Sequence, residues 1–183
     1  MKRFFIALLL CVFMLSGCSS ETDTTANTNN TSSSTESVKP EEPEKLDSEK
    51  EYHIGDTWTV DGQWSLTINS ITETDFRNEF SDTNPSHVYM IDYSYENLGY
   101  KDANGIMNGL YFDLEISQIV DSSGVMGASY PGEITNYAQE TPVGAKCNAQ
   151  SCIGVDTSGT ITLHISQYDG NSVEHKATFV LEP

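Results

Sequence analysis

The sequence has few basic side chains, with nine Lys and Arg against 27 Asp and Glu and a formal net charge of −18. A nucleic-acid surface needs clustered Lys and Arg to neutralise phosphates. Docking on anionic lipid headgroups likewise needs a basic patch. The composition therefore excludes nucleic acid as a partner and excludes electrostatic attachment to a membrane.

Long apolar runs are also lacking, and the one present, at residues 4–15, is too short for a helix that spans a bilayer. Lys2 and Arg3 precede it, as in the positive region of a signal peptide. The tetrad Leu-Ser-Gly-Cys that ends at Cys18 resembles a bacterial lipobox. We predict a lipoprotein signal peptide at residues 1–17 and a membrane partner reached through a diacylglyceryl anchor on Cys18. The alternative is an ordinary secretory signal.

Residues 18–50 have almost nothing apolar to bury. Ser, Thr and Asn dominate up to residue 37, and Pro and Glu follow. Such a composition cannot offset the entropy lost on ordering, so it predicts a disordered stalk behind the lipidated cysteine.

Residues 51–183 are predicted to form one β-domain. Apolar and polar side chains alternate with period two at residues 64–69, 89–95, 110–116, 161–166 and 177–181. Turn signals such as Asp61-Gly62 and Asp169-Gly170 separate these runs, and only residues 74–80 suggest a short helix. The fold expected is all-β, an immunoglobulin-like antiparallel β-sandwich of seven or eight strands.

Several short motifs resemble a family of unknown function on Gram-positive surface lipoproteins. They are YSYENLG at residues 93–99, FDL at 112–114 before VDSSG at 120–124, and PVG at 142–144 before CIGV at 152–155. The resemblance implies an immunoglobulin-like domain similar in fold to a secreted mycobacterial immunogenic protein. It implies no activity and no catalytic residues.

Only two cysteines, Cys147 and Cys152, lie in the predicted domain. An even number of thiols in an exported domain predicts a disulfide between them. Such a bridge would require residues 148–151 to turn back as a loop, because an extended strand would hold the two residues too far apart. A redox-active pair is the alternative, although the Cys-x-x-Cys spacing is missing.

Motifs for catalysis and for cofactors are missing as well. There is no Gly-x-Ser-x-Gly and no phosphate-binding glycine loop, and the histidines, including His164 on the polar phase of its strand, show no ligand spacing. We predict no catalytic residue, no cofactor and no metal. Calcium remains an alternative at Asp75, Glu79 and Asp82, or at Asp102 with Asn104.

Tyrosines offer the best hint of a ligand. Tyr100, Tyr111, Tyr130 and Tyr137 fall near predicted loops or on the polar phase of strands, and residues 130–137 form the longest irregular stretch. Exposed tyrosines are typical of surfaces that bind sugars or proteins. We predict that these four contact a cell-wall, glycan or protein ligand. The alternative is that they pack at the rim of the core.

The predicted protein is a monomeric, non-catalytic binding module on the outer face of a Gram-positive-like cytoplasmic membrane. Residues 52–183 hold 18 acidic and 4 basic side chains, a net charge of −14, which suits a domain held away from an anionic surface. Alternatives are an envelope enzyme or enzyme inhibitor, a structural or antigenic coat protein, and a location in the periplasm or outer membrane.

Overall fold

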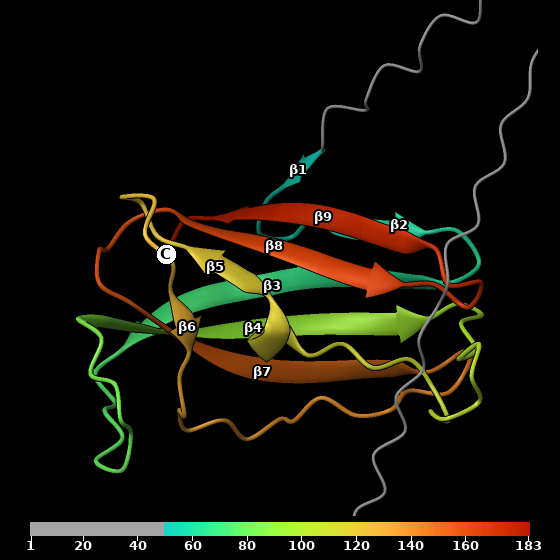
Figure 1. The fold of residues 1–183 in the computed structure, drawn as a ribbon, viewed down its shortest axis with the longest axis horizontal. Coiled ribbons are helices and arrows are strands. Elements are labelled where there is room, and N and C mark those ends of the chain that lie inside the picture. Colours follow the sequence, from blue (N-terminus) through green and yellow to red (C-terminus); the bar gives the residue numbers. More distant parts are fainter. Residues whose placement is uncertain (1–49) are drawn as a thin grey trace, which may run out of the picture. The chain divides into compact units, whose positions relative to one another are not determined.

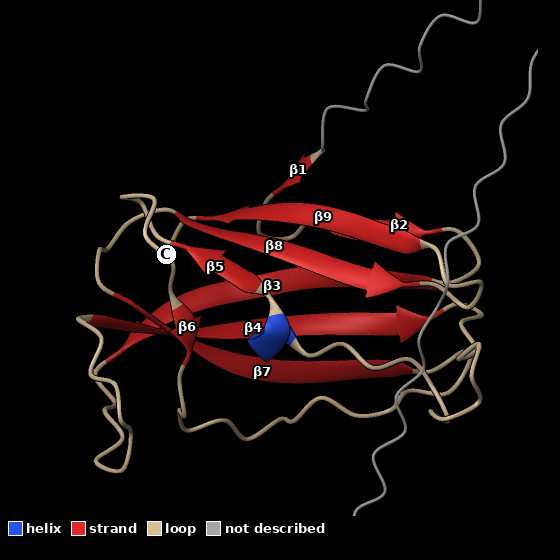
Figure 2. Ribbon diagram, in the orientation of Figure 1, coloured by secondary structure: helices blue, strands red, loops and turns tan. Residues whose placement is uncertain are grey.

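The computed structural model describes residues 50–183, and this part of the chain forms two β-sheets (Figures 1 and 2). The four-stranded sheet has the order β1-β9-β8-β5 and the five-stranded sheet the order β2-β3-β4-β7-β6. The strands are β1 (Glu51–Tyr52), β2 (Thr57–Val60), β3 (Trp64–Thr74), β4 (His87–Asn97), β5 (Gln118–Val120), β6 (Ala128–Ser129), β7 (Lys146–Val155), β8 (Ile161–Tyr168) and β9 (Glu174–Leu181).

Neighbouring strands are antiparallel, except that β1 pairs with β9 in parallel. The inward-facing side chains of both sheets form one core, so the predicted all-β immunoglobulin-like sandwich is confirmed. The described residues hold nine strands rather than seven or eight. The additional ones are two-residue strands that alternation cannot reveal, because a period needs more positions to appear.

Alternation places the core residues of the long strands as the sequence predicts. Trp64, Leu66 and Ile68 are buried along β3. The pairing of β3 with β4 then shifts register between Ile68 and Ser70, and Ile71 is the next buried residue. This β-bulge changes the phase of the alternation. It explains why the predicted strand ends at residue 69 whereas β3 continues to Thr74.

Trp64 lies at the centre of an aromatic cluster. Its ring is fully buried and makes edge contacts with Trp58 and Phe112, both with centroids 5.7 Å away. The rings of Tyr100 and His175 complete the cluster at 6.1 and 5.6 Å. These contacts join β2 and β3 of the five-stranded sheet to β9 of the other sheet. They therefore hold the two sheets together.

Two predicted elements are wrong. Residues 110–116 do not form a strand: Leu110 makes an isolated bridge to Thr141, and a single 3-10 turn, η1 (Leu114–Ile116), follows. Leu110, Phe112 and Leu114 are nevertheless buried, so the alternation reports an extended path across the core rather than sheet pairing. Residues 75–80 are a loop instead of a helix.

The predicted signal peptide, Cys18 and nearly all of the stalk lie outside the described residues. Between residues 50 and 183, no helix is long and apolar enough to cross a membrane.

Candidate functional site

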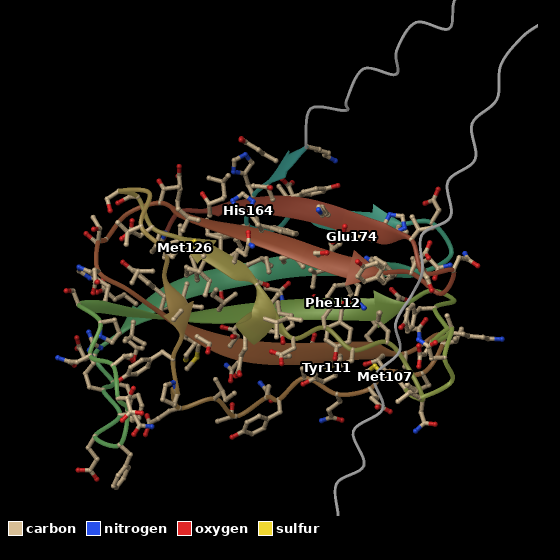
Figure 3. The ribbon with its side chains drawn as sticks, in the orientation of Figure 1. Met107, Tyr111, Phe112, Met126, His164 and Glu174 are labelled. Atoms are coloured by element: carbon tan, nitrogen blue, oxygen red, sulfur yellow. The ribbon has the colours of Figure 1, made fainter. Side chains whose placement is uncertain are left out.

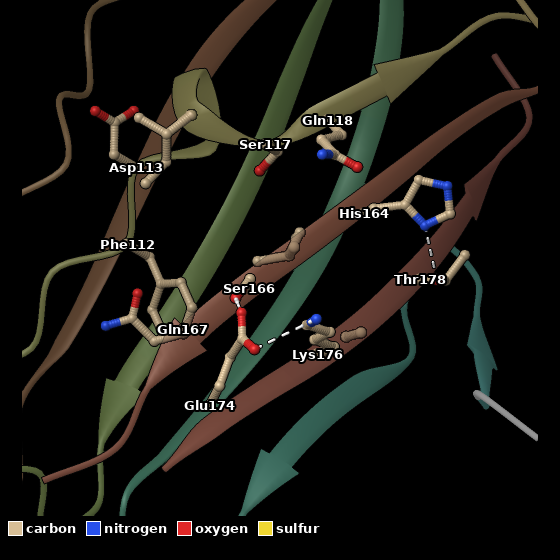
Figure 4. Close-up of a pocket in the computed structure, with 13 residues that line it drawn as sticks. Phe112, Asp113, Ser117, Gln118, His164, Ser166, Gln167, Glu174, Lys176 and Thr178 are labelled. Carbon is tan, nitrogen blue, oxygen red and sulfur yellow. Dashed lines mark hydrogen bonds and ion pairs between the residues drawn. The ribbon is translucent and has the colours of Figure 1, made fainter. Parts of the chain in front are cut away.

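An open hollow of about 530 Å³ lies on the outer face of the four-stranded sheet (Figure 4). One side is formed by β8 and β9, and the other by the segment that leads through η1 into β5. The hollow is lined by Phe112, Asp113, Ile116, Ser117, Gln118, His164, Ile165, Ser166, Gln167, Glu174, Lys176, Ala177 and Thr178.

The polar side chains reach the hollow because of strand alternation. In β8, His164 and Ser166 are exposed, whereas their neighbours Leu163 and Ile165 are buried. The register of β8 with β9 sets Ser166 beside Lys176 and His164 beside Thr178. Cross-strand partners share a face, so these side chains lie together on the solvent side.

A chain of hydrogen bonds orders the side chains on this face. Ser166 Oγ donates to Glu174 Oε1 at 2.6 Å, and Lys176 Nζ lies 3.3 Å from Glu174 Oε2. The Ser166 hydroxyl and then the Lys176 ammonium lower the pKa of Glu174 below its usual value. His164 Nδ1 is 3.0 Å from Thr178 Oγ1. The hollow therefore presents both donors and acceptors in fixed positions.

The opposite wall is set by η1. Asp113 caps this turn by accepting a hydrogen bond from the Glu115 amide at 2.9 Å. The turn precedes β5, and pairing with β8 begins only at Gln118. Ile116, on the turn, is 77% exposed, so the wall offers an apolar side chain opposite the polar strands.

This arrangement is better suited to binding than to catalysis. A general base near neutral pH needs a raised pKa, but the pKa of Glu174 is lowered, which makes it a weak base for Ser166. His164 has a threonine partner and no carboxylate to orient it. Two histidine–carboxylate pairs, His87–Glu73 and His175–Asp169, are present, but neither lines the hollow.

The four predicted contact tyrosines do not form one surface. Tyr130 and Tyr100 are 4% and 7% exposed. The Tyr130 hydroxyl accepts a hydrogen bond from the Asn78 amide at 2.8 Å. Their burial does not support their assignment as exposed ligand contacts, although Tyr130 lines a second open hollow of about 360 Å³. Tyr111 is half-buried and Tyr137 is 63% exposed, but neither lines the hollow. His164 and Glu174 instead project from the β8–β9 sheet (Figure 3).

The predicted disulfide between Cys147 and Cys152 is absent, and both thiols are free. Both residues lie in the continuous strand β7, opposite Tyr95 and Met90 of β4. An odd separation along a strand puts them on opposite faces, and five residues of strand span about 16 Å. Bridged residues need Cα atoms within about 7 Å, so this strand cannot hold the bond.

The acidic side chains proposed as calcium ligands are not assembled into a site. Asp102 accepts hydrogen bonds from the backbone amides of Asn104, Ile106 and Met107, at 3.2, 2.6 and 3.0 Å. These bonds lower the pKa of Asp102 and occupy the oxygens that a cation would need. Across residues 50–183, no group of three or more His, Cys, Asp and Glu side chains could hold a metal ion.

Sequence reasoning missed the hollow as a site. His164 was expected to be a solvated strand residue, and its exposure confirms this. Ser166, Glu174 and Lys176 were not singled out, because polar residues on alternate strand positions look the same on any solvated sheet face. The available signal was that two adjacent C-terminal strands both carry hydrogen-bonding side chains on their polar phase.

A comparison with protein-family models finds no match, and neither does a comparison with curated proteins. The predicted membership of the lipoprotein family of unknown function therefore stays a prediction. Among solved structures, the chain is similar to MPT63, a secreted protein from Mycobacterium tuberculosis, with a TM-score of 0.50 and 10% identity over 74% of this chain and 98% of that one. This similarity supports the predicted fold and shows nothing more.

Two proteins from Bacillus subtilis are similar at lower scores. The lipoprotein candidate ycdA has a TM-score of 0.49 and 10% identity over 66% of this chain, which spans only 37% of ycdA. The yjhA protein has a TM-score of 0.47 and 12% identity over 72% of this chain and 98% of that one.

Proposed function

We propose that the chain is a lipid-anchored extracytoplasmic binding module whose ligand occupies the hollow on the β8–β9 sheet. Cys18 carries the lipid, residues 19–50 act as the tether and residues 51–183 present the binding surface. The observation that carries this proposal is the set of ordered polar side chains, Ser166, Glu174 and Lys176, on the floor of a hollow of about 530 Å³. That volume falls within the usual range of ligand sites.

The electrostatics of the floor favour a ligand that donates hydrogen bonds or carries positive charge. Glu174 is ionised at neutral pH, as an ordinary glutamate is, and its Ser166 and Lys176 partners lower its pKa further. Asp113 adds a second carboxylate to the lining, against one ammonium from Lys176. The net charge of −14 on residues 52–183 extends this preference to the whole domain.

Photo-crosslinking in cells tests the binding role. A photoreactive amino acid at Gln118, in the hollow, should cross-link an envelope component of defined mass. The control places the same amino acid at Thr67, a part-exposed position on the outer face of the five-stranded sheet. Products at Gln118 alone support the proposal. Equal products at both positions, or none at either, contradict it.

The anchor is tested separately by Cys18→Ala. The wild-type chain should fractionate with membranes, and its mature N-terminal residue should carry a diacylglyceryl group by mass spectrometry. The variant should lose the lipid. An unmodified Cys18 in the wild-type chain, or cleavage at another position, would refute the anchor and leave the binding role to be judged by cross-linking.

A further inference from the structure

The edge of β8 that faces the hollow is only half paired. β5 pairs with residues 162–164 of β8, through Val120, Ile119 and Gln118. β8 continues to Tyr168 and pairs with β9 over its whole length. Residues 114–117, which precede Gln118, form η1 and its C-cap and have no strand pairing with β8. Residues 165–168 therefore have a strand on one side and, among the residues that the structure describes, none on the other.

The hydrogen-bond phase identifies which backbone groups face this opening. The Asp169 amide donates to the Val173 carbonyl at 2.8 Å, at the turn between β8 and β9. Backbone groups of successive strand residues point to opposite sides in an antiparallel ladder. Odd-numbered residues of β8 therefore face β9, and the N–H and C=O groups of Ser166 and Tyr168 face away from it.

β5 confirms this phase from the other side. The Ile119 carbonyl accepts a hydrogen bond from the Gly127 amide at 2.9 Å, on the edge away from β8. Gln118 and Val120 must then face β8, where their partners are the even-numbered His164 and Thr162. No hydrogen bond from any other residue in 50–183 reaches the backbone N–H or C=O of Ser166 or Tyr168.

The occupant that matches this edge is an extended polypeptide. The free N–H and C=O groups belong to residues two apart along the strand, so they repeat about every 7 Å. The backbone groups of another extended strand repeat with the same spacing and can pair with them. Ser166 is exposed and Tyr168 is 57% exposed, so the approach is open. Pairing in the antiparallel direction of β5 would place the partner residues opposite Ser166 and Tyr168 on the outer face, where Glu174 lies.

The charge of the surroundings selects the partner. Glu174 and Asp113 line the hollow, with Lys176 as the counter-charge. A second copy of this chain would bring another domain of net charge −14 against the first, which disfavours pairing between copies. A segment with basic side chains meets the carboxylates instead.

We propose that the open edge of β8 at Ser166 and Tyr168 binds an extended basic segment of a partner protein by antiparallel strand addition. The proposal rests on the proposed function, because it names the ligand class of the same hollow. It also gives the backbone of β8 a part in ligand binding, which the side chains that line the hollow do not by themselves reveal.

N-methylated peptides test strand addition directly. The probe is a capped, fluorescein-labelled peptide of alternating Lys and Val, and fluorescence polarisation measures its binding to the full chain in neutral detergent. Outward-facing Lys residues would pair with Ser166 and Tyr168 through their own amides. N-methylation of the Lys amides should therefore weaken binding about tenfold or more, because two backbone hydrogen bonds are lost. N-methylation of the Val amides should change it less than about threefold.

A change in the protein gives a second arm. Ser166→Pro removes an N–H that has no partner in the domain, so the fold tolerates it better than a proline that faces a paired strand. It should weaken peptide binding about tenfold. The matched variant Ser166→Ala loses the same hydroxyl but keeps the N–H, so it should bind the peptide more tightly than Ser166→Pro. If Ser166→Pro fails to fold, the N-methylated peptides still test strand addition on the wild-type chain.

Several outcomes would overturn strand addition. Equal loss with both methylated peptides, no loss with either, or no binding of the unmodified peptide would each do so. A concentration-dependent dimer of the wild-type chain in sedimentation, abolished by Ser166→Pro, would assign the edge to a second copy. Cross-links at Gln118 combined with any of these results would keep the hollow as a binding site while rejecting strand addition by a basic segment of a partner protein.

Discussion

The edges of β7 and β8 differ in how completely their backbones are paired. Along β7, β6 pairs with Ile153 and Gly154, and an irregular loop then continues the pairing. The Tyr130 amide donates to the Cys152 carbonyl at 2.9 Å, and the Gln150 amide donates to the Asn136 carbonyl at 2.8 Å. Along β8, pairing with β5 stops at His164.

The difference shows that this chain can protect an edge without a long strand. On β7, two residues of strand and a loop are sufficient, because the Gln150 side chain accepts hydrogen bonds from the loop amides of Thr135 and Asn136. Unpaired edges attract other strands, so proteins usually protect them. Among the partly paired edges, we assign the interaction site to β8 because its open part borders the hollow.

Proline substitutions should produce the largest contrast between the two edges. Gln150→Pro removes the bond to Asn136 and the side-chain bonds to Thr135 and Asp92, so it should destabilise the domain by about 3 kcal/mol. Ser166→Pro, on the open edge, should cost less than about 1 kcal/mol. Urea denaturation of both variants measures the difference. Equal losses would contradict the assignment of β8 as open.

A larger side chain at Gly132 should separate the loop from β7. A Cβ atom at this position would collide with the Cys152 Sγ and Cβ atoms, so the loop must lift. We expect Gly132→Val to destabilise the domain by about 2 kcal/mol. Burial raises the pKa of the Cys152 thiol, so the same change should also speed its alkylation.

The matched control is Glu133→Val, at the adjacent exposed position. Timed alkylation followed by mass spectrometry of the peptide that contains Cys152 gives the rate. If Gly132→Val and Glu133→Val react at the same rate, the loop does not shield this thiol.

The stabilisation that Asp121 provides in the turn after β5 should be lost in acid. Asp121 accepts hydrogen bonds from Ser123 and from the amides of Val125 and Thr157, and these lower its pKa to about 2. A depressed pKa stabilises the fold above the unfolded-state value and loses that effect as the pH falls through the folded-state value. The melting temperature should therefore fall between about pH 4 and pH 2.

Asp121→Asn should remove this part of the acid sensitivity, and it should already melt lower at neutral pH. Asp82→Asn, on an exposed loop, should leave the melting curve at each pH unchanged. The same acid slope in wild type and Asp121→Asn would show that other carboxyl groups control it.

The smallest effect is expected at the floor of the hollow. Ser166→Ala removes the first cause of the lowered pKa of Glu174, so that pKa should rise towards its usual value. The melting temperature should change by no more than about 2 °C, because exposed polar pairs contribute little to stability. An NMR titration of the Glu174 carboxyl group measures the shift, and an unchanged titration would contradict the role of Ser166.

The long strands could be predicted from the sequence because their pattern is local. Tyr89, Ile91, Tyr93 and Tyr95 occupy alternate positions, and all four are buried along β4. The same rule failed at residues 110–116, where Leu110 and Phe112 are buried without a partner strand. The Phe112 carbonyl accepts a hydrogen bond from the Tyr93 hydroxyl, a contact that no local pattern contains.

The tyrosines and cysteines were misjudged for a related reason. Tyr130 lies in an irregular stretch, which predicts exposure, but the distant Asn78 and the β7 edge hold it in place. Cys147 and Cys152 suit a disulfide by number alone. Whether residues 148–151 form a loop or a strand depends on β4, because its pairing keeps β7 extended throughout.

The sequence by itself determined the β class, the positions of the long strands β3, β4, β8 and β9 and the acidic character of the domain, because alternation and charge are local properties of the chain. It also carries the prediction of an export signal and of lipidation at Cys18. Only the tertiary structure decided where pairing ends along β8. That boundary depends on η1, which precedes β5 and delays pairing with β8 until Gln118, and on contacts between segments more than forty residues apart.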